Sequence, residues 1–204
     1  MPSTTTAPTR TVPVQHLIDR LQELTDTDFL NVAKPLAVLR ALPVDPESIA
    51  PYVFWNPQHY TRNLIHKTEL YELLAICWDV GMRSSIHNHK NQNCWMAAPI
   101  GKLQVNNYRV LEEDLASQHC NIVPTDTVEI TQANPVAVDP RHPVHDVRNP
   151  REWNQRAVSL HLYSRPFDSC IVYSCEQRTC GEIGLSYTSM HGKLVNGGGE
   201  VGPD

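Results

Sequence analysis

The chain has 204 residues, of which 41% are hydrophobic and 19% charged, enough for one compact domain with an appended helical segment. Its 17 basic and 22 acidic residues give a formal net charge of −5, which argues against a nucleic-acid-binding surface. No apolar run approaches the roughly 20 residues that span a bilayer, and the start MPSTTTAPTR lacks the basic and apolar regions of a secretory signal. We therefore expect a cytoplasmic monomer that binds neither membranes nor nucleic acids.

Histidine and cysteine are the unusual residues of this composition, with ten of the first and six of the second. In a reducing compartment those cysteines would be mostly thiols, so their number points to metal or catalytic chemistry rather than to disulfides.

Helical patterns occupy the first quarter of the chain. Residues 1–12 are rich in Ser, Thr and Pro and are predicted to be disordered, as is the tail 195–204, so that residues 13–194 form a single domain. Apolar residues at helical spacing predict a helix over 14–25 and a second, weaker one over 32–42. A short helix or turn is expected over 45–52, with Asp45 as its cap and Pro46 at its first position.

Strand-like runs follow from residue 60 onward, separated by clusters of Gly, Asn, Pro and Asp. The clearest are residues 71–78, 103–105, 127–130 and 157–163, and the last alternates cleanly between apolar and polar side chains. Many short strands after a helical start predict a mainly β fold, an antiparallel barrel or sandwich with a small N-terminal helical cap.

The richest motif surrounds two histidines, His87 and His89, whose side chains point the same way if they lie in a strand. Alone, the pair is weak evidence, because a surface strand can carry two histidines by chance. The flanking residues add Gly81 before the pair and Cys94 and Gly101 after it. This spacing is that of the first cupin motif, Gly-x5-His-x-His-x4-Glu-x6-Gly, with Cys94 at the usual glutamate position.

A third histidine comes from residues 140–149, which resemble the second cupin motif, Pro-x-Gly-x-x-His-x3-Asn. His145 occupies the histidine position, and the alternative, His142, replaces the glycine three residues earlier. Three neutral imidazoles leave the charge of a divalent ion uncompensated, so such a centre would attract a thiolate and lower its pKa. Imidazole suits iron, and zinc is the competing ion on ligand type alone.

At this level of detail the chain resembles the cysteine dioxygenase family, the thiol dioxygenases of the cupin superfamily, from about Tyr60 to Arg178. The resemblance implies a cupin-type antiparallel β-barrel, or jelly roll. The segments that carry it are residues 60–64 (substrate carboxylate), 76–78 (pocket strand), 84–89 with Cys94 (metal segment and cross-linking cysteine) and 158–164 (Ser-His-Tyr strand).

The resemblance also implies a reaction and its cofactor. Fe2+ would be held by His87, His89 and His145, and O2 would be the co-substrate that adds both of its atoms to the sulfur of a small thiol. For L-cysteine the product is cysteine sulfinic acid. In family members with cysteine at the Cys94 position, a thioether joins it to the tyrosine that matches Tyr163.

Further roles follow from residue chemistry together with the resemblance. Ser159, His161 and Tyr163 are two apart, so a strand projects them to one side, where they could form a hydrogen-bond relay that orients the phenol; a plain polar surface is the alternative. Arg62 could bind a substrate carboxylate through two parallel hydrogen bonds, the alternative being a solvated surface charge, and Tyr60 could add a hydroxyl contact.

One difference between this sequence and the family pattern affects which thiol is expected as the substrate. Arg165 stands where close relatives of the animal enzymes have a second proline; relatives that oxidise 3-mercaptopropionate tend to carry Arg there but pair it with Gln at the Arg62 position. Cysteine is the first choice because Arg62 and Cys94 both match its specialists. If Arg165 reaches the pocket, two cations would also suit a dicarboxylic thiol such as mercaptosuccinate. Cys170 matches a cysteine near the family's pocket mouth, and its role stays open.

Two other classes of function compete. A non-enzymatic metal-binding cupin would have a filled coordination sphere and no thiol-dependent oxygen uptake. Another cupin enzyme, such as a metal-dependent isomerase, is disfavoured by the missing glutamate at Cys94. Neither accounts for Arg62, Cys94 and Tyr163 together.

Overall fold

The helices of the computed structural model, which describes residues 10–195, precede every strand in the chain. Prolines, acidic caps and a capping box at Thr25 and Asp28 delimit these short segments. The predicted cap at Asp45 is present, since its side chain accepts a hydrogen bond from the backbone of Glu47. The helices are α1 (Val14–Gln22), α2 (Asp26–Leu30), α3 (Ala33–Ala41) and α4 (Pro46–Ile49), followed by the 3-10 turn η1 (Ala50–Tyr52).

The predicted termini fall mostly outside the described part of the chain. Residues 1–9 and 196–204 are not described, whereas Val12, inside the segment predicted to be disordered, forms a parallel bridge with Val44. The sequence patterns missed α2, because its five residues are too few to display helical periodicity.

Strands make up the rest of the domain, interrupted by the 3-10 turn η2 (Arg151–Trp153). They are β1 (Thr61–Lys67), β2 (Tyr71–Trp78), β3 (Ile86–His87), β4 (Cys94–Ile100), β5 (Leu103–Asp114), β6 (His119–Ile130), β7 (Val136–Ala137), β8 (Val144–Arg148), β9 (Ala157–Ser164), β10 (Ser169–Ser174), β11 (Thr179–Gly184), β12 (Ser189–Met190) and β13 (Lys193–Leu194).

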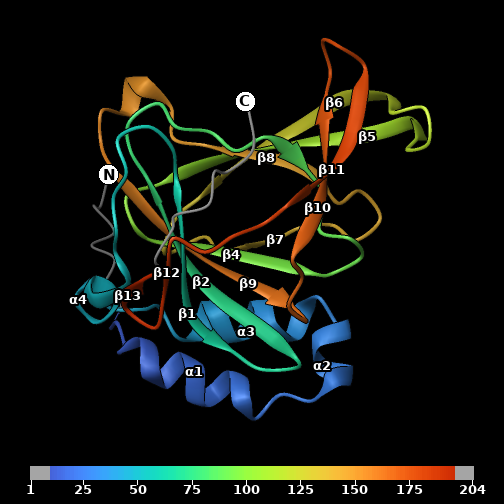
Figure 1. Ribbon diagram of the computed structural model, residues 1–204. Coiled ribbons are helices and arrows are strands. Elements are labelled where there is room, and N and C mark those ends of the chain that lie inside the picture. Colours follow the sequence, from blue (N-terminus) through green and yellow to red (C-terminus); the bar gives the residue numbers. More distant parts are fainter. Residues whose placement is uncertain (1–9, 196–204) are drawn as a thin grey trace, which may run out of the picture.

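These strands form two sheets. One has seven strands in the order β13-β12-β1-β2-β9-β4-β7, and the other closes in the order β10-β11-β6-β5-β8-β3. Helices α1, α2 and α3 lie along one side of the seven-stranded sheet, while the second sheet lies on its other side (Figure 1). The mainly β barrel with an N-terminal helical cap is therefore confirmed.

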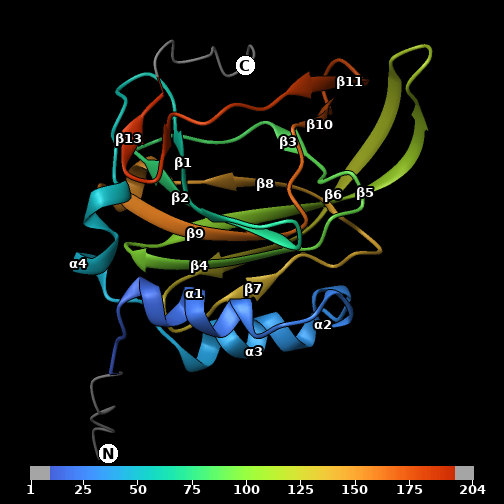
Figure 2. The same cartoon turned by 60° about the horizontal axis from the view of Figure 1, so that its bottom comes forward.

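Alternation along β9 assigns its residues to two separate cores. Val158, Leu160 and Leu162 pack with the helices, whereas Tyr163 belongs to the core between the sheets. The turned view of Figure 2 shows α1 and α3 running beneath β4 and β9. Because successive strand residues face opposite sides, the polar residues of β9 are directed into the barrel.

Strand pairing brings distant parts of the sequence together at the barrel interior. Within the seven-stranded sheet, Tyr163 of β9 lies opposite Cys94 of β4 and opposite Glu72 of β2. In the second sheet His87 of β3 pairs with His145 of β8. Within residues 10–195, no helix has both the length and the apolar character needed to cross a membrane.

Candidate active site

Three imidazoles meet inside the barrel. One ligand nitrogen each from His87, His89 and His145 can be chosen so that all lie within 4.8 Å of one another. His87 and His145 come from paired strands, and His89 follows two residues after His87. The three predicted ligands are thus brought together, while His142, the alternative to His145, lies exposed in the turn before β8.

Backbone carbonyls orient two of these rings. Nδ1 of His87 lies 2.9 Å from the carbonyl oxygen of Ser85, and Nδ1 of His145 lies 3.0 Å from that of Pro143. Because a carbonyl oxygen only accepts hydrogen bonds, each Nδ1 must carry the proton, which leaves Nε2 with a free lone pair. The local fold therefore prepares both rings to ligate through Nε2.

Burial keeps the three rings neutral. It is the largest cause lowering the pKa of each one, to about 3 for His145 and well below the ordinary value for His89, and the neighbouring imidazoles add to the effect on these two. Neutral imidazole is the form that binds a metal ion.

The nitrogens of this cluster are also unsatisfied within the protein. Both ring nitrogens of His89 and Nε2 of His145 are buried without a hydrogen-bond partner. Buried polar atoms of native proteins nearly always have a partner, so these atoms fit a ligand from outside the chain. The donor set suits a divalent transition metal that keeps open coordination positions.

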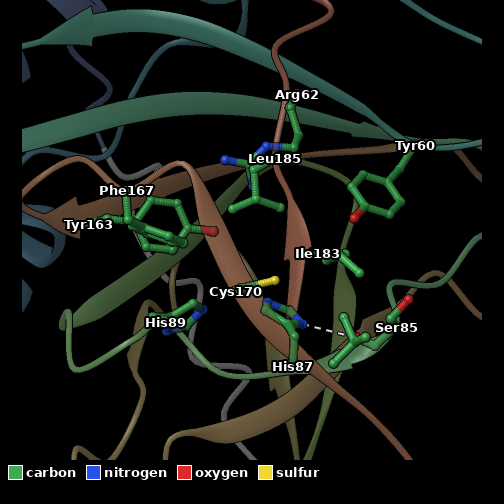
Figure 3. A pocket seen from close by; sticks show the side chains of 11 residues that line it. Tyr60, Arg62, Ser85, His87, His89, Tyr163, Phe167, Cys170, Ile183 and Leu185 are labelled. Carbon is green, nitrogen blue, oxygen red and sulfur yellow. Dashed lines mark hydrogen bonds between the residues drawn. The ribbon is translucent and has the colours of Figure 1, made fainter. Parts of the chain in front are cut away.

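A small pocket of about 30 Å³ opens onto the cluster. Arg62 and Tyr60 face His87 and His89 across it (Figure 3). Arg62, on β1, is only 6% exposed, and its Nε has no hydrogen-bond partner. Burial lowers the pKa of Arg62, but interactions with neighbours, chiefly Tyr163, Tyr60 and Glu72, outweigh burial and raise it. A buried, charged guanidinium with a free donor suits a carboxylate ligand.

The Ser-His-Tyr strand is arranged differently from the predicted relay. His161 Nδ1 lies 3.0 Å from the Tyr163 hydroxyl, as the relay requires. Ser159, however, accepts a hydrogen bond of 2.9 Å from the indole nitrogen of Trp78, and Nε2 of His161 is buried without a partner. The buried indole N–H needs an acceptor, and the Ser159 hydroxyl on the neighbouring strand supplies it.

Cys94 and Tyr163 lie side by side. They are directly opposite in paired strands and are 1% and 2% exposed. Side chains in such cross-strand positions have their Cβ atoms about 5 Å apart. Burial is the main cause that raises the pKa of both groups, so the thiol and the phenol are protonated at neutral pH.

Arg165 does not reach the pocket. It has a left-handed backbone conformation, with φ of 61°, and its guanidinium donates to both carboxylate oxygens of Asp26 at 2.9 and 3.0 Å on the outside of the molecule. Among the described residues that line the pocket, Arg62 is the one Lys or Arg. A second cation in the pocket, which would suit a dicarboxylic thiol, is therefore not supplied by Arg165.

Several pocket residues escaped sequence reasoning. Phe167 packs edge-on against Tyr163 at 5.0 Å between ring centroids, and its ring centroid lies 5.9 Å from that of His89. Ile183 and Leu185, beyond the range of any motif, complete an apolar wall. Cys170 does line the pocket, and burial is the main cause raising the pKa of its thiol to about 11.

The chain is similar to several known proteins. The family model described as cysteine dioxygenase type I matches residues 1–176. Cysteine dioxygenase type 1 of Homo sapiens is 32% identical over 80% of this chain and 78% of its own length, and that of Rattus norvegicus is 33% identical over the same shares. A crystal structure of a protein with a double-stranded β-helix domain from Klebsiella pneumoniae gives a TM-score of 0.39 at 12% identity, covering 58% of this chain and 87% of that chain.

The chain belongs to the cysteine dioxygenase type I family. This membership confirms the resemblance found in the sequence and the prediction of a dioxygenase enzyme.

Proposed function

We propose that this protein is a cysteine dioxygenase, which uses Fe2+ and O2 to convert L-cysteine to cysteine sulfinic acid. The reaction adds both oxygen atoms to the thiol sulfur, so that RSH and O2 give RSO2H with no other reductant. One observation carries the proposal. His87, His89 and His145 form a cluster able to hold a metal ion, with unpartnered buried nitrogens on His89 and His145, and His87 and His89 line the same small pocket as a buried arginine whose Nε lacks a partner.

Iron fits this site better than zinc for a chemical reason. Both ions accept imidazole ligands, but Zn2+ has no accessible redox chemistry and cannot activate O2. When bound, Fe2+ would supply the redox chemistry that lets O2 react with a thiolate. His87, His89 and His145 would hold it.

Arg62 positions the substrate in this proposal. Its guanidinium binds the cysteine carboxylate by charge-assisted hydrogen bonds, which fixes the distance from the carboxylate to the metal. Tyr60, whose ring stacks on Trp78 with centroids 4.8 Å apart, contributes its hydroxyl from the same side.

Tyr163, with Cys94 beside it, completes the side of the pocket at which the reaction would take place. His161 fixes the orientation of the Tyr163 hydroxyl, while Phe167 limits the freedom of its ring. Cys94 and Tyr163 lie opposite each other in β4 and β9, which supports a thioether between them, formed by loss of two hydrogens to O2. Peptide mass spectrometry of iron-loaded, aerated protein should find the two residues joined, lighter by two hydrogen atoms. Separate peptides after repeated turnover would contradict the link.

A turnover experiment tests the reaction itself. Protein loaded anaerobically with Fe2+ should consume one O2 per cysteine and form the sulfinate, with both oxygens labelled from ¹⁸O2, whereas the zinc-loaded protein should be inert. 3-Mercaptopropionate and mercaptosuccinate are assayed in parallel, and a higher kcat/KM for either would change the substrate. No oxygen uptake with any of the three would instead support a non-enzymatic metal-binding cupin.

We also propose that the enzyme works in the cytoplasm as a monomer. The six cysteines form no disulfide, which agrees with a reducing compartment. Size-exclusion chromatography with light scattering tests the oligomeric state.

A further inference from the structure

Glu72 is a charged residue in the interior of the barrel. It lies on β2 and is 0% exposed, in a strand whose other seven residues are Tyr, Leu, Leu, Ala, Ile, Cys and Trp. By alternation it shares its face with Leu74, Ile76 and Trp78, which belong to the core between the sheets. A buried carboxylate is costly unless neighbouring groups compensate it, so its presence here calls for a reason.

Its contacts compensate it only in part. The Tyr187 hydroxyl donates a hydrogen bond to Oε2 of Glu72, while Oε1 is buried without a partner. Lys67, which lies opposite Glu72 in register, approaches the Tyr187 hydroxyl at 3.3 Å. Burial is the largest influence on the pKa of Glu72 and raises it above its ordinary value, while the hydrogen bond from Tyr187 and the charges of Arg62 and Lys67 favour the carboxylate form and offset part of that rise.

Glu72 acts on the pocket through Arg62. It does not line the pocket, so a substrate there meets the guanidinium and not the carboxylate. Glu72 nevertheless lies directly opposite Tyr163, a residue that lines the pocket, in the paired strands β2 and β9. Its charge also acts on the pKa of Arg62. Since Arg165 is turned away toward Asp26, Arg62 is the one lysine or arginine among the described lining residues, and Glu72 offsets part of its charge.

We propose that Glu72 is a specificity-determining residue that restricts the pocket to thiols with a single carboxylate. The inference rests on the proposed function, in which Arg62 binds the carboxylate of a small thiol. One carboxylate pairs with the guanidinium at short range. A second carboxylate finds no further cation and is repelled by the fixed negative charge of Glu72 through a medium of low dielectric constant.

Replacement of Glu72 by glutamine isolates this charge. The variant E72Q keeps the volume of the side chain and an oxygen that can accept the Tyr187 hydrogen bond, but removes the negative charge. The ratio of kcat/KM for mercaptosuccinate to that for cysteine should rise by about tenfold. Y187F should move the ratio in the same direction by a smaller factor, because loss of its hydrogen bond favours the uncharged form of Glu72.

A matched control comes from the same chain. Glu113, at the outer end of β5, also accepts a hydrogen bond from a tyrosine, Tyr173, but it is exposed and is not among the charges that act on the pKa of Arg62. E113Q should leave the substrate ratio unchanged. The Kd values of cysteine and mercaptosuccinate for zinc-loaded protein, measured by calorimetry, give the same ratio without turnover.

The outcomes separate the two proposals. If wild-type protein binds cysteine but never oxidises it, the proposed reaction fails while the binding ratio still tests Glu72. If wild type turns over cysteine and the ratios for E72Q and Y187F stay at the wild-type value, Glu72 does not set specificity. If E72Q fails to fold, Y187F tests the inference by itself, and a ratio equal to that of wild type contradicts it. Wild-type protein that binds neither thiol also contradicts the inference.

Discussion

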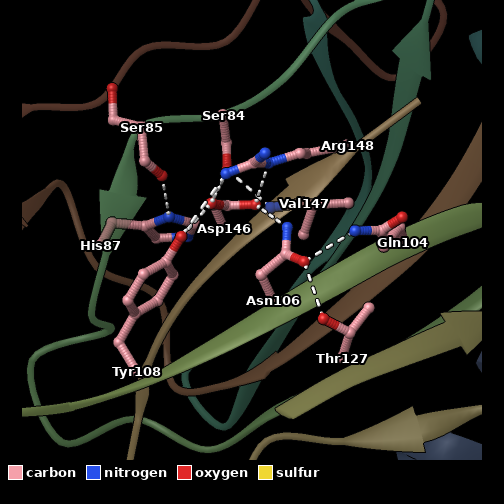
Figure 4. A network of polar contacts seen from close by, with 10 residues as sticks. All are labelled: Ser84, Ser85, His87, Gln104, Asn106, Tyr108, Thr127, Asp146, Val147 and Arg148. Carbon is pink, nitrogen blue, oxygen red and sulfur yellow. Dashed lines mark hydrogen bonds and ion pairs between the residues drawn. The ribbon is translucent and has the colours of Figure 1, made fainter. Parts of the chain in front are cut away.

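Buried polar groups on the two faces of β8 differ in whether they have hydrogen-bond partners. His145 faces inward, and its Nε2 is buried without a partner. The next residue, Asp146, faces the other side and is only 1% exposed, yet both of its oxygens are fully engaged. Asn106 and Arg148 donate to Oδ1 at 2.6 and 2.8 Å, and Tyr108 and Arg148 donate to Oδ2 at 2.8 Å each (Figure 4).

This contrast distinguishes polar groups that stabilise the barrel from polar groups that are available to bind a ligand. A satisfied network such as that of Asp146 stiffens the strand and fixes its register. The unsatisfied nitrogen of His145 would gain a partner on binding a metal ion. Loss of His145 should therefore affect function, and loss of Asp146 should affect stability.

Removal of a metal ligand should have the largest effect. H145A should lower metal affinity and cysteine oxidation by more than about a hundredfold, because two imidazoles cannot replace three. Metal analysis and oxygen uptake measure this, and the thermal midpoint of the metal-free variant should stay near that of metal-free wild type. The matched variant H142A, at the exposed histidine three residues earlier, should retain both properties. Equal losses in the two variants would contradict the assignment of His145.

Removal of the pocket cation should come next. R62M should lower kcat/KM for cysteine by about a hundredfold, since a charge-assisted, bidentate contact is lost. The loss should appear chiefly in KM. R165M is the control, because the Arg165 side chain pairs with Asp26 outside the pocket, and it should leave kcat/KM unchanged. A fall for R165M comparable to that for R62M would place Arg165 in substrate binding after all.

Disruption of the outer network should reduce stability rather than activity. D146N should lower the free energy of unfolding by about 2 kcal/mol, because the buried Tyr108 and the partly buried Arg148 and Asn106 lose an ionised acceptor. Urea unfolding measures the change, with metal content as the functional readout. D139N removes an exposed carboxylate that pairs with Arg141, and should cost less than about 0.5 kcal/mol. Loss of metal together with unchanged stability in D146N would reverse the contrast between the two faces.

The same network predicts a small pH effect. Burial raises the pKa of Asp146, but hydrogen bonds from Arg148, Asn106 and Tyr108 outweigh it and hold the pKa below its ordinary value of 3.8. A carboxyl group with a lowered pKa stabilises the fold fully above the pKa of the unfolded chain, and this contribution is lost as pH falls through the lower, folded-state value. The stability gap between wild type and D146N should therefore hold from neutral pH down to about 4 and narrow below it. A gap that widened on acidification would show that the carboxylate is not the stabilising form.

Spacing along the chain was enough to predict much of the site. The interval between His87, His89 and Cys94 and the motif around His145 are local patterns, although the strand expected for both histidines of the pair ends at His87 and His89 lies just beyond it. The alternation of residues 157–163 likewise predicted both faces of β9 correctly. These features depend on backbone geometry, which every strand shares.

Other features depended on contacts between segments far apart in sequence. Ser159 binds Trp78, which lies 81 residues earlier, so no local pattern could show that the indole would take the place of His161. Glu72 was visible as a charge in an apolar strand, but its partner Tyr187 lies 115 residues away. Whether a polar side chain has a partner is decided by tertiary packing.

The sequence by itself thus determined the kind of centre, because the two local motifs around His87 with His89 and around His145 identify which histidines can supply its ligands. Only the tertiary structure decided which charges the centre feels. Arg62 and Arg165 are equally cationic in the sequence, yet one is buried in the pocket and the other pairs with Asp26 at the surface. The physical reason is that an electrostatic interaction depends on distance and solvent exposure, and neither is encoded in a residue's own neighbourhood along the chain.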